Sequence, residues 1–143
     1  MRPDPVLEPW LKTLILIYLW VAFVEDVLLF LMSWFAPELW FHAFHATSPD
    51  GLDITWLRRS GGQWAAFALA QGITIWRWRT QPVWLAVSAG VRFSDLFTDI
   101  SYIVAAPSLT TLGWTLLLPP PFLNLVGIII MLRGYDQAAN ASR

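Results

Sequence analysis

The sequence has 143 residues, of which 57% are hydrophobic and 13% charged, and its mean hydropathy is +0.54. Soluble domains average about 25% charged residues, so this composition indicates a membrane protein. The net charge of −1 excludes the basic footprint of a nucleic-acid-binding protein, and the absence of cysteine excludes disulfides, thiolate metal sites and thiol catalysis.

A membrane-spanning helix needs about 20 residues, so the chain has room for four spans. We predict an all-α fold, a single integral membrane domain over 1–143 that forms a four-helix transmembrane bundle. The spans are expected at approximately 11–35, 60–77, 83–106 and 109–132. The first span carries two adjacent acids, Glu25 and Asp26, a little past its centre.

The longest predicted loop, 36–59, holds a short amphipathic helix that begins at Pro37. Glu38, His42 and His45 share one face of this helix, and carboxylate and imidazole are ordinary zinc or copper ligands. No thiolate completes the set. The alternatives are polar tips of an interfacial helix that point toward water, or histidines that ligate a haem or chlorin of a neighbouring chain.

The second span has small residues at every fourth position, which is typical of a close helix–helix contact. These residues are Gly62, Ala66, Ala70 and Thr74. The span ends in alternating aromatic residues and cations, Trp76, Arg77, Trp78 and Arg79. This corner is predicted either to bind anionic lipid headgroups or to act as an ordinary cytoplasmic anchor.

The third span is apolar enough to cross a bilayer, but Arg92, Asp95 and Asp99 lie in its middle. On a helix they fall on one stripe with Ser88 and Tyr102. The opposite side is a small-residue surface that allows another helix to approach closely. It consists of Gly90, Ser94, Thr98 and Ser101.

The fourth span contains Pro119–Pro121, which must kink or break its helix. It is therefore either a kinked full span or a re-entrant segment. Of the nine Lys and Arg residues, Arg92 lies within a span, Arg58 and Arg59 lie on the side of the 36–59 loop, and the other six lie on the side of the termini. The positive-inside rule then places both termini in the cytoplasm and the loop outside. The expected location is a bacterial inner membrane.

The acids of the first and third spans are expected at the same depth, in the outer half of the bundle. The predicted cluster consists of Glu25, Asp26, Arg58, Arg59, Arg92, Asp95 and Asp99. Four acids beside one core arginine cannot all stay ionised in a dry interior, so some are protonated, or the two outer arginines complete the set, or water enters. The cluster is a packing network, a cavity for a ligand headgroup or cofactor, or a proton relay.

Arg58-Arg59-Ser60-Gly61-Gly62 opens the second span, which is alanine-rich and ends in Trp76-Arg77, and Arg92-x-x-Asp95 lies in the third. These three features resemble the small four-helix bacterial membrane proteins of the DoxX-like set. The resemblance covers about residues 10–133, and Pro119–Pro121 and the tryptophan content depart from it. It implies a four-helix fold and topology rather than a particular activity.

The leading hypothesis is a non-catalytic accessory subunit that packs against a larger, energy-transducing membrane complex and binds lipid or pigment. Its expected partners are other membrane subunits and lipids. No motif encodes a cofactor or a catalytic triad. The alternative is a small-molecule or lipid-binding membrane protein, or an enzyme, that uses the acid–arginine cavity.

Overall fold

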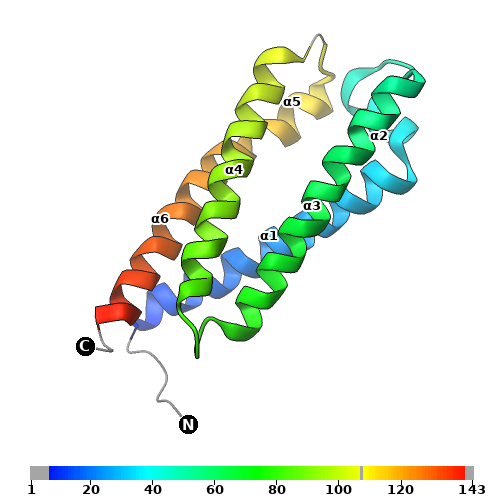
Figure 1. Cartoon of the computed structure of the whole chain (residues 1–143). Helices are drawn as coiled ribbons and strands as arrows, with labels where there is room; N and C mark the ends of the chain where they lie inside the picture. Colours follow the sequence, from blue (N-terminus) through cyan, green and yellow to red (C-terminus); the bar gives the residue numbers. More distant parts are fainter. Residues whose placement is uncertain (1–6, 107, 141–143) are drawn as a thin grey trace.

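A computed structural model of the chain describes residues 7–106 and 108–140, which are helical throughout apart from short connections (Figure 1). The helices are α1 (Pro9–Phe35), α2 (Pro37–His45), α3 (Gly51–Arg77), α4 (Val83–Ala105), α5 (Thr111–Leu117) and α6 (Pro119–Asn140). The described residues contain no strand. The predicted all-α class is confirmed.

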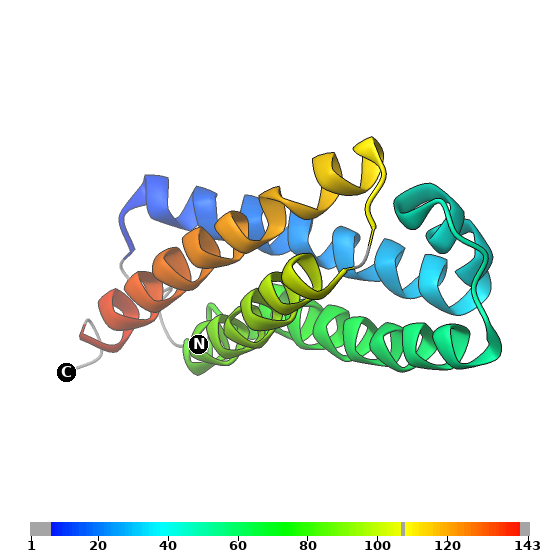
Figure 2. The ribbon, with the colours of Figure 1, turned by 90° about the horizontal axis from the view of Figure 1, so that it is seen from above.

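The four long helices form two pairs. α1 packs chiefly against α3, and α4 packs chiefly against α6, whereas fewer contacts join one pair to the other. Figures 1 and 2 show the short helices α2 and α5 at one end of the bundle, and the start of α1, the end of α6 and the α3–α4 connection at the other. The short-helix end is where the loop between the first two spans was expected.

Two helical stretches, Pro9–Phe35 and Thr111–Asn140, are long and apolar enough to span a membrane. α3 and α4 have 27 and 23 residues, so their lengths of about 40 and 35 Å also suffice. They do not meet the criterion of apolar composition, because α4 carries three charged residues and α3 carries Arg and Gln side chains. A membrane association is thus supported by two helices, and four spans are not confirmed.

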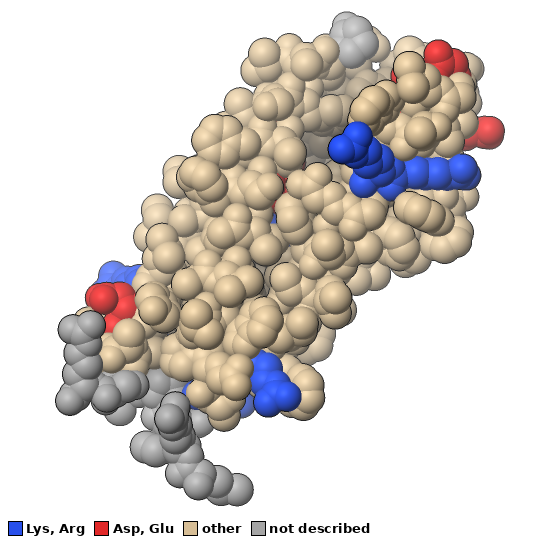
Figure 3. Space-filling model, in the orientation of Figure 1, with Lys and Arg blue, Asp and Glu red and all other residues tan. Residues whose placement is uncertain are grey.

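The sides of the bundle are apolar. Large hydrophobic side chains are exposed along all four long helices, among them Val21, Leu69, Phe97 and Ile129. On the face drawn in Figure 3, most Lys, Arg, Asp and Glu atoms lie toward the two ends, and the band between them is formed by other residues apart from a few charged atoms inside a hollow. Such a surface is unusual for a water-soluble protein.

α3 begins at Gly51, nine residues before the predicted start of the second span. Asp50 caps it, because its Oδ1 accepts hydrogen bonds of 2.8 Å from the backbone N–H groups of Leu52 and Asp53. In return, Asp53 Oδ2 accepts from the N–H of Asp50 at 3.1 Å. This capping box starts the helix two turns outside the apolar segment, and hydropathy therefore missed those turns.

The helix break predicted at the prolines is confirmed. α5 ends at Leu117 and α6 starts at Pro119, a position where proline is well accommodated. α5 turns back onto α2: the Thr110 N–H donates to the Phe44 carbonyl at 2.8 Å, and Thr110 Oγ1 donates to the Ala43 carbonyl at 2.6 Å. The same hydroxyl caps α5 by accepting from the N–H of Gly113 at 2.9 Å.

The close-packing face predicted for the second span is wrong at Gly62, although Thr74 of the same predicted face is buried. Gly61, not Gly62, faces α1, and a Cβ at Gly61 would overlap the Ser33 hydroxyl. Gly62 is exposed, and a Cβ there would meet nothing within 4 Å. The four-residue repeat alone did not show which of the two adjacent glycines lies on the side of α3 that faces α1.

The described residues form two buried apolar clusters, and the smaller one, of Trp40, Phe44 and Leu57, lies at the α2 end of the bundle. The larger one lies at the opposite end and consists of Leu11, Ile15, Leu19, Trp78, Leu85, Ala89 and Met131. Trp78 is only 1% exposed, so it is a core residue rather than an interfacial anchor as predicted. This apolar packing fills the half of the bundle away from α2 and α5, which we call the lower half.

The contact of α5 with α2 predicts an effect at Gly113, where a Cβ would lie 2.6 Å from the backbone carbonyl oxygen of Phe44. We expect Gly113→Ala to lower the free energy of unfolding by about 1–3 kcal/mol, because a backbone atom cannot rotate away. Gly90→Ala is the control, since a Cβ there meets nothing within 4 Å. It should be neutral or stabilising by up to about 1 kcal/mol. Equal stability of the two variants in detergent unfolding would contradict the close contact.

Candidate functional site

Arg92 joins α4 to α1 in the middle of the bundle. Its NH2 lies 2.5 Å from Asp26 Oδ2, and its NH1 lies 3.0 Å from Asp95 Oδ2. The Arg92 and Asp26 residues are 1% and 0% exposed, and Asp95 is 6% exposed. A buried charge needs a partner of opposite charge, and these two ion pairs supply it.

Two amide side chains extend the cluster to the other long helices. Gln71 of α3 donates from Nε2 to Asp26 Oδ2. Asn124 of α6 donates from Nδ2 to Asp95 Oδ2 at 3.3 Å and to Asp99 Oδ2 at 2.9 Å, and its Oδ1 accepts from Arg92 NH1 at 3.3 Å. Every long helix therefore contributes to one buried polar cluster.

The cluster predicted from the sequence did not include Gln71 or Asn124. The available signal was the presence of one amide within an otherwise apolar segment, as for Asn124 between Leu123 and Leu125. Such an isolated amide must find a hydrogen-bond partner inside the bundle. The two partners here are the carboxylates of Asp95 and Asp99.

The two outer arginines do not complete the cluster, which corrects one of the sequence-based alternatives. Arg58 Nε donates to the Trp34 backbone carbonyl at 3.3 Å, and the Arg59 guanidinium lies 5.1 Å from the centre of the Trp56 ring. Both arginines are exposed. Their side chains leave the α3 helix toward its surface, and the acids of the cluster have Arg92 as their cation.

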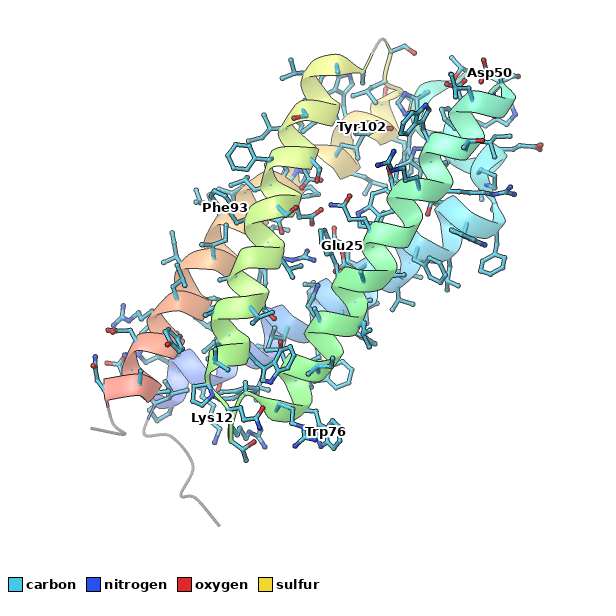
Figure 4. All side chains as sticks on the ribbon, viewed as in Figure 1. Lys12, Glu25, Asp50, Trp76, Phe93 and Tyr102 are labelled. Atoms are coloured by element: carbon cyan, nitrogen blue, oxygen red, sulfur yellow. The ribbon has the colours of Figure 1, made fainter. Side chains whose placement is uncertain are left out.

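A cavity of about 580 Å³ lies between the two helix pairs, in the half of the bundle that carries α2 and α5. Side chains of all six helices line it, and we call it the acidic cavity because Glu25, Asp95 and Asp99 are among them. Figure 4 shows Glu25 in the space between α3 and α4, and Figure 3 shows a hollow there with acidic atoms at its floor. Of the predicted cluster, the structure thus brings together Glu25, Asp26, Arg92, Asp95 and Asp99.

Glu25 differs from the other acids of the cluster. It is half-buried, lines the acidic cavity and makes no ion pair or side-chain hydrogen bond with any residue that the structure describes. Aromatic rings also line the acidic cavity. The ring centroids of Trp40 and Trp64 are 5.4 Å apart, and those of Trp40 and Phe44 are 4.7 Å apart. The remaining walls are largely aliphatic.

Tyr102 and Trp40 lie between the acidic cavity and a second one, and His45 lines the second. The Tyr102 hydroxyl accepts from Trp40 Nε1 at 3.2 Å and is hydrogen-bonded to His45 Nε2. The second cavity, of about 520 Å³, shares Trp40, Leu57, Ser60 and Tyr102 with the first and extends to Asp53 and Ser108 at the end of the bundle. The Tyr102 side chain therefore lies between the acidic cavity and the end of the molecule.

The structure does not bring Glu38, His42 and His45 together as a metal site. His45 Nδ1 lies 2.8 Å from the Ser108 carbonyl and its Nε2 faces the Tyr102 hydroxyl, so both ring nitrogens have protein partners. Glu38 and His42 are exposed on α2. Among the described residues, no group of three or more His, Cys, Asp or Glu side chains is placed to hold a metal ion.

Three of the four residues predicted to bind lipid headgroups are exposed, namely Trp76, Arg77 and Arg79. Arg77 lies 4.2 Å from the centre of the Trp76 ring, and both side chains are exposed. Arg79 is exposed as well, but its neighbour Trp78 belongs to the core. One aromatic residue and two cations are therefore available at this end of the bundle.

The chain matches no protein-family model, no curated protein and no solved structure. The resemblance to the DoxX-like set stays a prediction. The functional argument consequently rests on the buried polar cluster and on the acidic cavity.

The ion pairs of Arg92 predict a large effect of its removal. Arg92→Leu should lower the free energy of unfolding by about 3–5 kcal/mol, because it leaves buried acids without their cation. Arg59→Leu removes an exposed arginine and is the matched control, expected to change stability by less than about 0.5 kcal/mol. Detergent or thermal unfolding measures both.

A double variant tests the partner. Asp26→Leu with Arg92→Leu removes both members of the closest ion pair, so it should recover part of the stability that Arg92→Leu alone loses. If the two single effects simply add, Asp26 and Arg92 do not stabilise each other.

Proposed function

We propose that the chain is an integral membrane protein whose four long helices all cross the bilayer. The apolar sides of the bundle support this, as does the position of five of its six exposed tryptophans: Trp10 and Trp76 lie near one end, and Trp34, Trp56 and Trp114 near the other, whereas Trp20 lies within α1. The charges of α4 do not oppose it, because Arg92 and Asp95 are buried and Asp99 is half-buried.

We further propose the orientation that the cation count favours, with the α2–α5 end outside and both termini in the cytoplasm of a bacterial cell. The acidic cavity then lies in the outer half of the membrane. Lining residues such as Leu28 and Leu116 are 60% and 51% exposed on the side of the bundle. The cavity is thus reached laterally, from among lipid chains.

In this setting, we propose that the protein binds a small amphipathic molecule in the acidic cavity. The observation that carries this proposal is the cavity itself: about 580 Å³ is the size of a typical small-molecule site, and its walls combine apolar surface with a few convergent polar groups. A network built only for packing would fill this space with side chains. Here Arg92 and Asn124 satisfy the deeper acids and leave the space above them open.

Binding is favoured over proton or ion conduction. A conductor needs a wet path through both halves of the bundle, whereas the half below Arg92 is packed with Ile15, Leu19, Leu85 and Met131. The proposed role is therefore recognition or carriage of a ligand at the outer leaflet.

Filling the cavity tests the proposal. Ser60 lines it from α3, whereas Gly62, two residues further along α3, is exposed with open space around it. The full chain is gently extracted from native membranes and examined by native mass spectrometry. We expect wild type and Gly62→Phe to retain a bound small molecule and Ser60→Phe to lose it, because the added ring occupies the binding space. The same adducts in all three proteins, or none in wild type, would refute ligand binding in this cavity.

A second candidate function, an accessory subunit of a larger membrane complex, is favoured by a different observation. The small-residue surface of α4 is uncovered: Gly90, Ser94, Thr98 and Ser101 are exposed, although Thr98 also lies at the edge of the acidic cavity. In a membrane, such a surface allows a helix of another chain to approach closely.

A bulky residue on this surface tests the accessory role. Gly90→Leu should remove any co-purifying membrane protein seen by native mass spectrometry, because the leucine side chain separates the helices, while leaving ligand adducts unchanged. Gly62→Leu, on an open position of α3, is the control. If the wild-type chain is extracted from native membranes with no other protein bound to it, the accessory role is refuted.

A further inference from the structure

We infer that the acidic cavity selects an organic cation: a molecule with an ammonium head and an apolar body. This inference deepens the proposed ligand binding and depends on it. It follows from the arrangement of charge, aromatic rings and apolar surface around one cavity.

The first step is the sign of the charge that faces the cavity. Its described lining includes three carboxyl side chains, Glu25, Asp95 and Asp99, and no Lys or Arg. Arg92 is 1% exposed, and both of its terminal nitrogens are used by Asp26, Asp95 and Asn124. Its charge is thus held behind the cavity wall. An anionic or carboxylate headgroup would meet acids and no cation there.

The second step is the balance of charge. Arg92 is one cation beside four acids, and Arg58 and Arg59 lie outside the cluster at Trp34 and Trp56. Ionised acids in a cavity of low dielectric constant are stabilised by a nearby positive charge. A bound ammonium group supplies that charge. Glu25, which has no described partner, is the acid best placed to contact it.

The third step is the chemical type of the cation. A divalent metal does not fit, since the described residues offer no group of three ligands to hold one. The cavity instead places Trp40, Trp64 and Tyr102 near the acids. Ammonium groups bind over the faces of such rings. The aliphatic wall formed by Leu28, Leu29 and Leu57 accommodates an alkyl chain.

The geometry also assigns an order to the parts of the ligand. The carboxyls of Asp95 and Asp99 lie at the polar floor next to Asn124. The more exposed residues Leu28 and Leu116 lie on the lateral side of the bundle. The ammonium head therefore points inward, and the alkyl chain points toward the lipid.

A series of three probes with the same alkyl chain tests the inference. Octyltrimethylammonium, octanol and octanoate are titrated into the full chain in lipid nanodiscs by isothermal titration calorimetry, with empty nanodiscs subtracted. We expect the cation to bind at least about tenfold more tightly than octanol, and octanoate to show no saturable binding. Equal affinity for the cation and octanol would overturn the selection of a cation and would indicate neutral acids.

Variants assign the selectivity to residues. Glu25→Gln should weaken binding of octyltrimethylammonium by roughly ten- to a hundredfold and leave octanol unchanged, because it removes one charge and little volume. Asp99→Asn provides a second variant with the same expectation. Glu38→Gln is the matched control: it makes the same change on the exposed face of α2, outside both cavities. An equal loss in Glu25→Gln and Glu38→Gln would overturn the assignment to the cavity.

Ser60→Phe separates failure of this inference from failure of the proposed function. If Ser60→Phe loses the native adduct but octyltrimethylammonium does not bind wild type, the cavity binds a ligand that is not an organic cation. If Ser60→Phe changes neither the native adduct nor probe binding, ligand binding in the cavity fails, and the cation inference fails with it.

Discussion

The structure depends on the two ion pairs of Arg92. The α1–α3 and α4–α6 pairs share fewer contacts with each other than the two helices share within each pair, and Arg92 of α4 reaches Asp26 of α1 across this boundary. A buried ion pair adds little net stability compared with an apolar contact, but a displaced one is costly. The ion pair between Arg92 and Asp26 therefore fixes the relative position of the two helix pairs. If the α4–α6 pair moved along the α1–α3 pair, a buried charge would lose its partner.

The acidic cavity follows from this constraint and from the two short helices. Below Arg92, large apolar side chains bring the pairs together around Leu19 and Leu85. Above it, α2 and α5 lie at the end of the bundle and are joined to each other through Thr110. The long helices are joined at the level of Arg92, and α2 and α5 lie at one end of the bundle. The space between these two levels is the cavity. The cavity is thus a property of the architecture as well as of its lining.

Hydropathy and helical periodicity predicted the helical class, the polar stripe of α4, the break at Pro119 and the approximate positions of the long helices. They also grouped Glu25 with Asp95 and Asp99, because equal distances along parallel helices give equal depth. They failed where the answer depends on rotation about a helix axis. Gly61 and Gly62 lie 100° apart on α3, and only the packed structure shows which one faces α1.

The same limit explains the errors at the charged residues. Arg58 and Arg59 were close enough in sequence depth to join the acids, but their helix turns both toward the surface, where backbone carbonyl and indole groups receive them. The rotation of α2 likewise turns His45 inward, where its ring nitrogens are hydrogen-bonded to the Ser108 carbonyl and the Tyr102 hydroxyl. One cation within the bundle does not balance the three carboxyl groups that line the acidic cavity, and no further Lys or Arg among the described residues lines it. That inequality is what gives the cavity a preference between ligands, since its apolar walls alone would accept an alkyl chain with any headgroup.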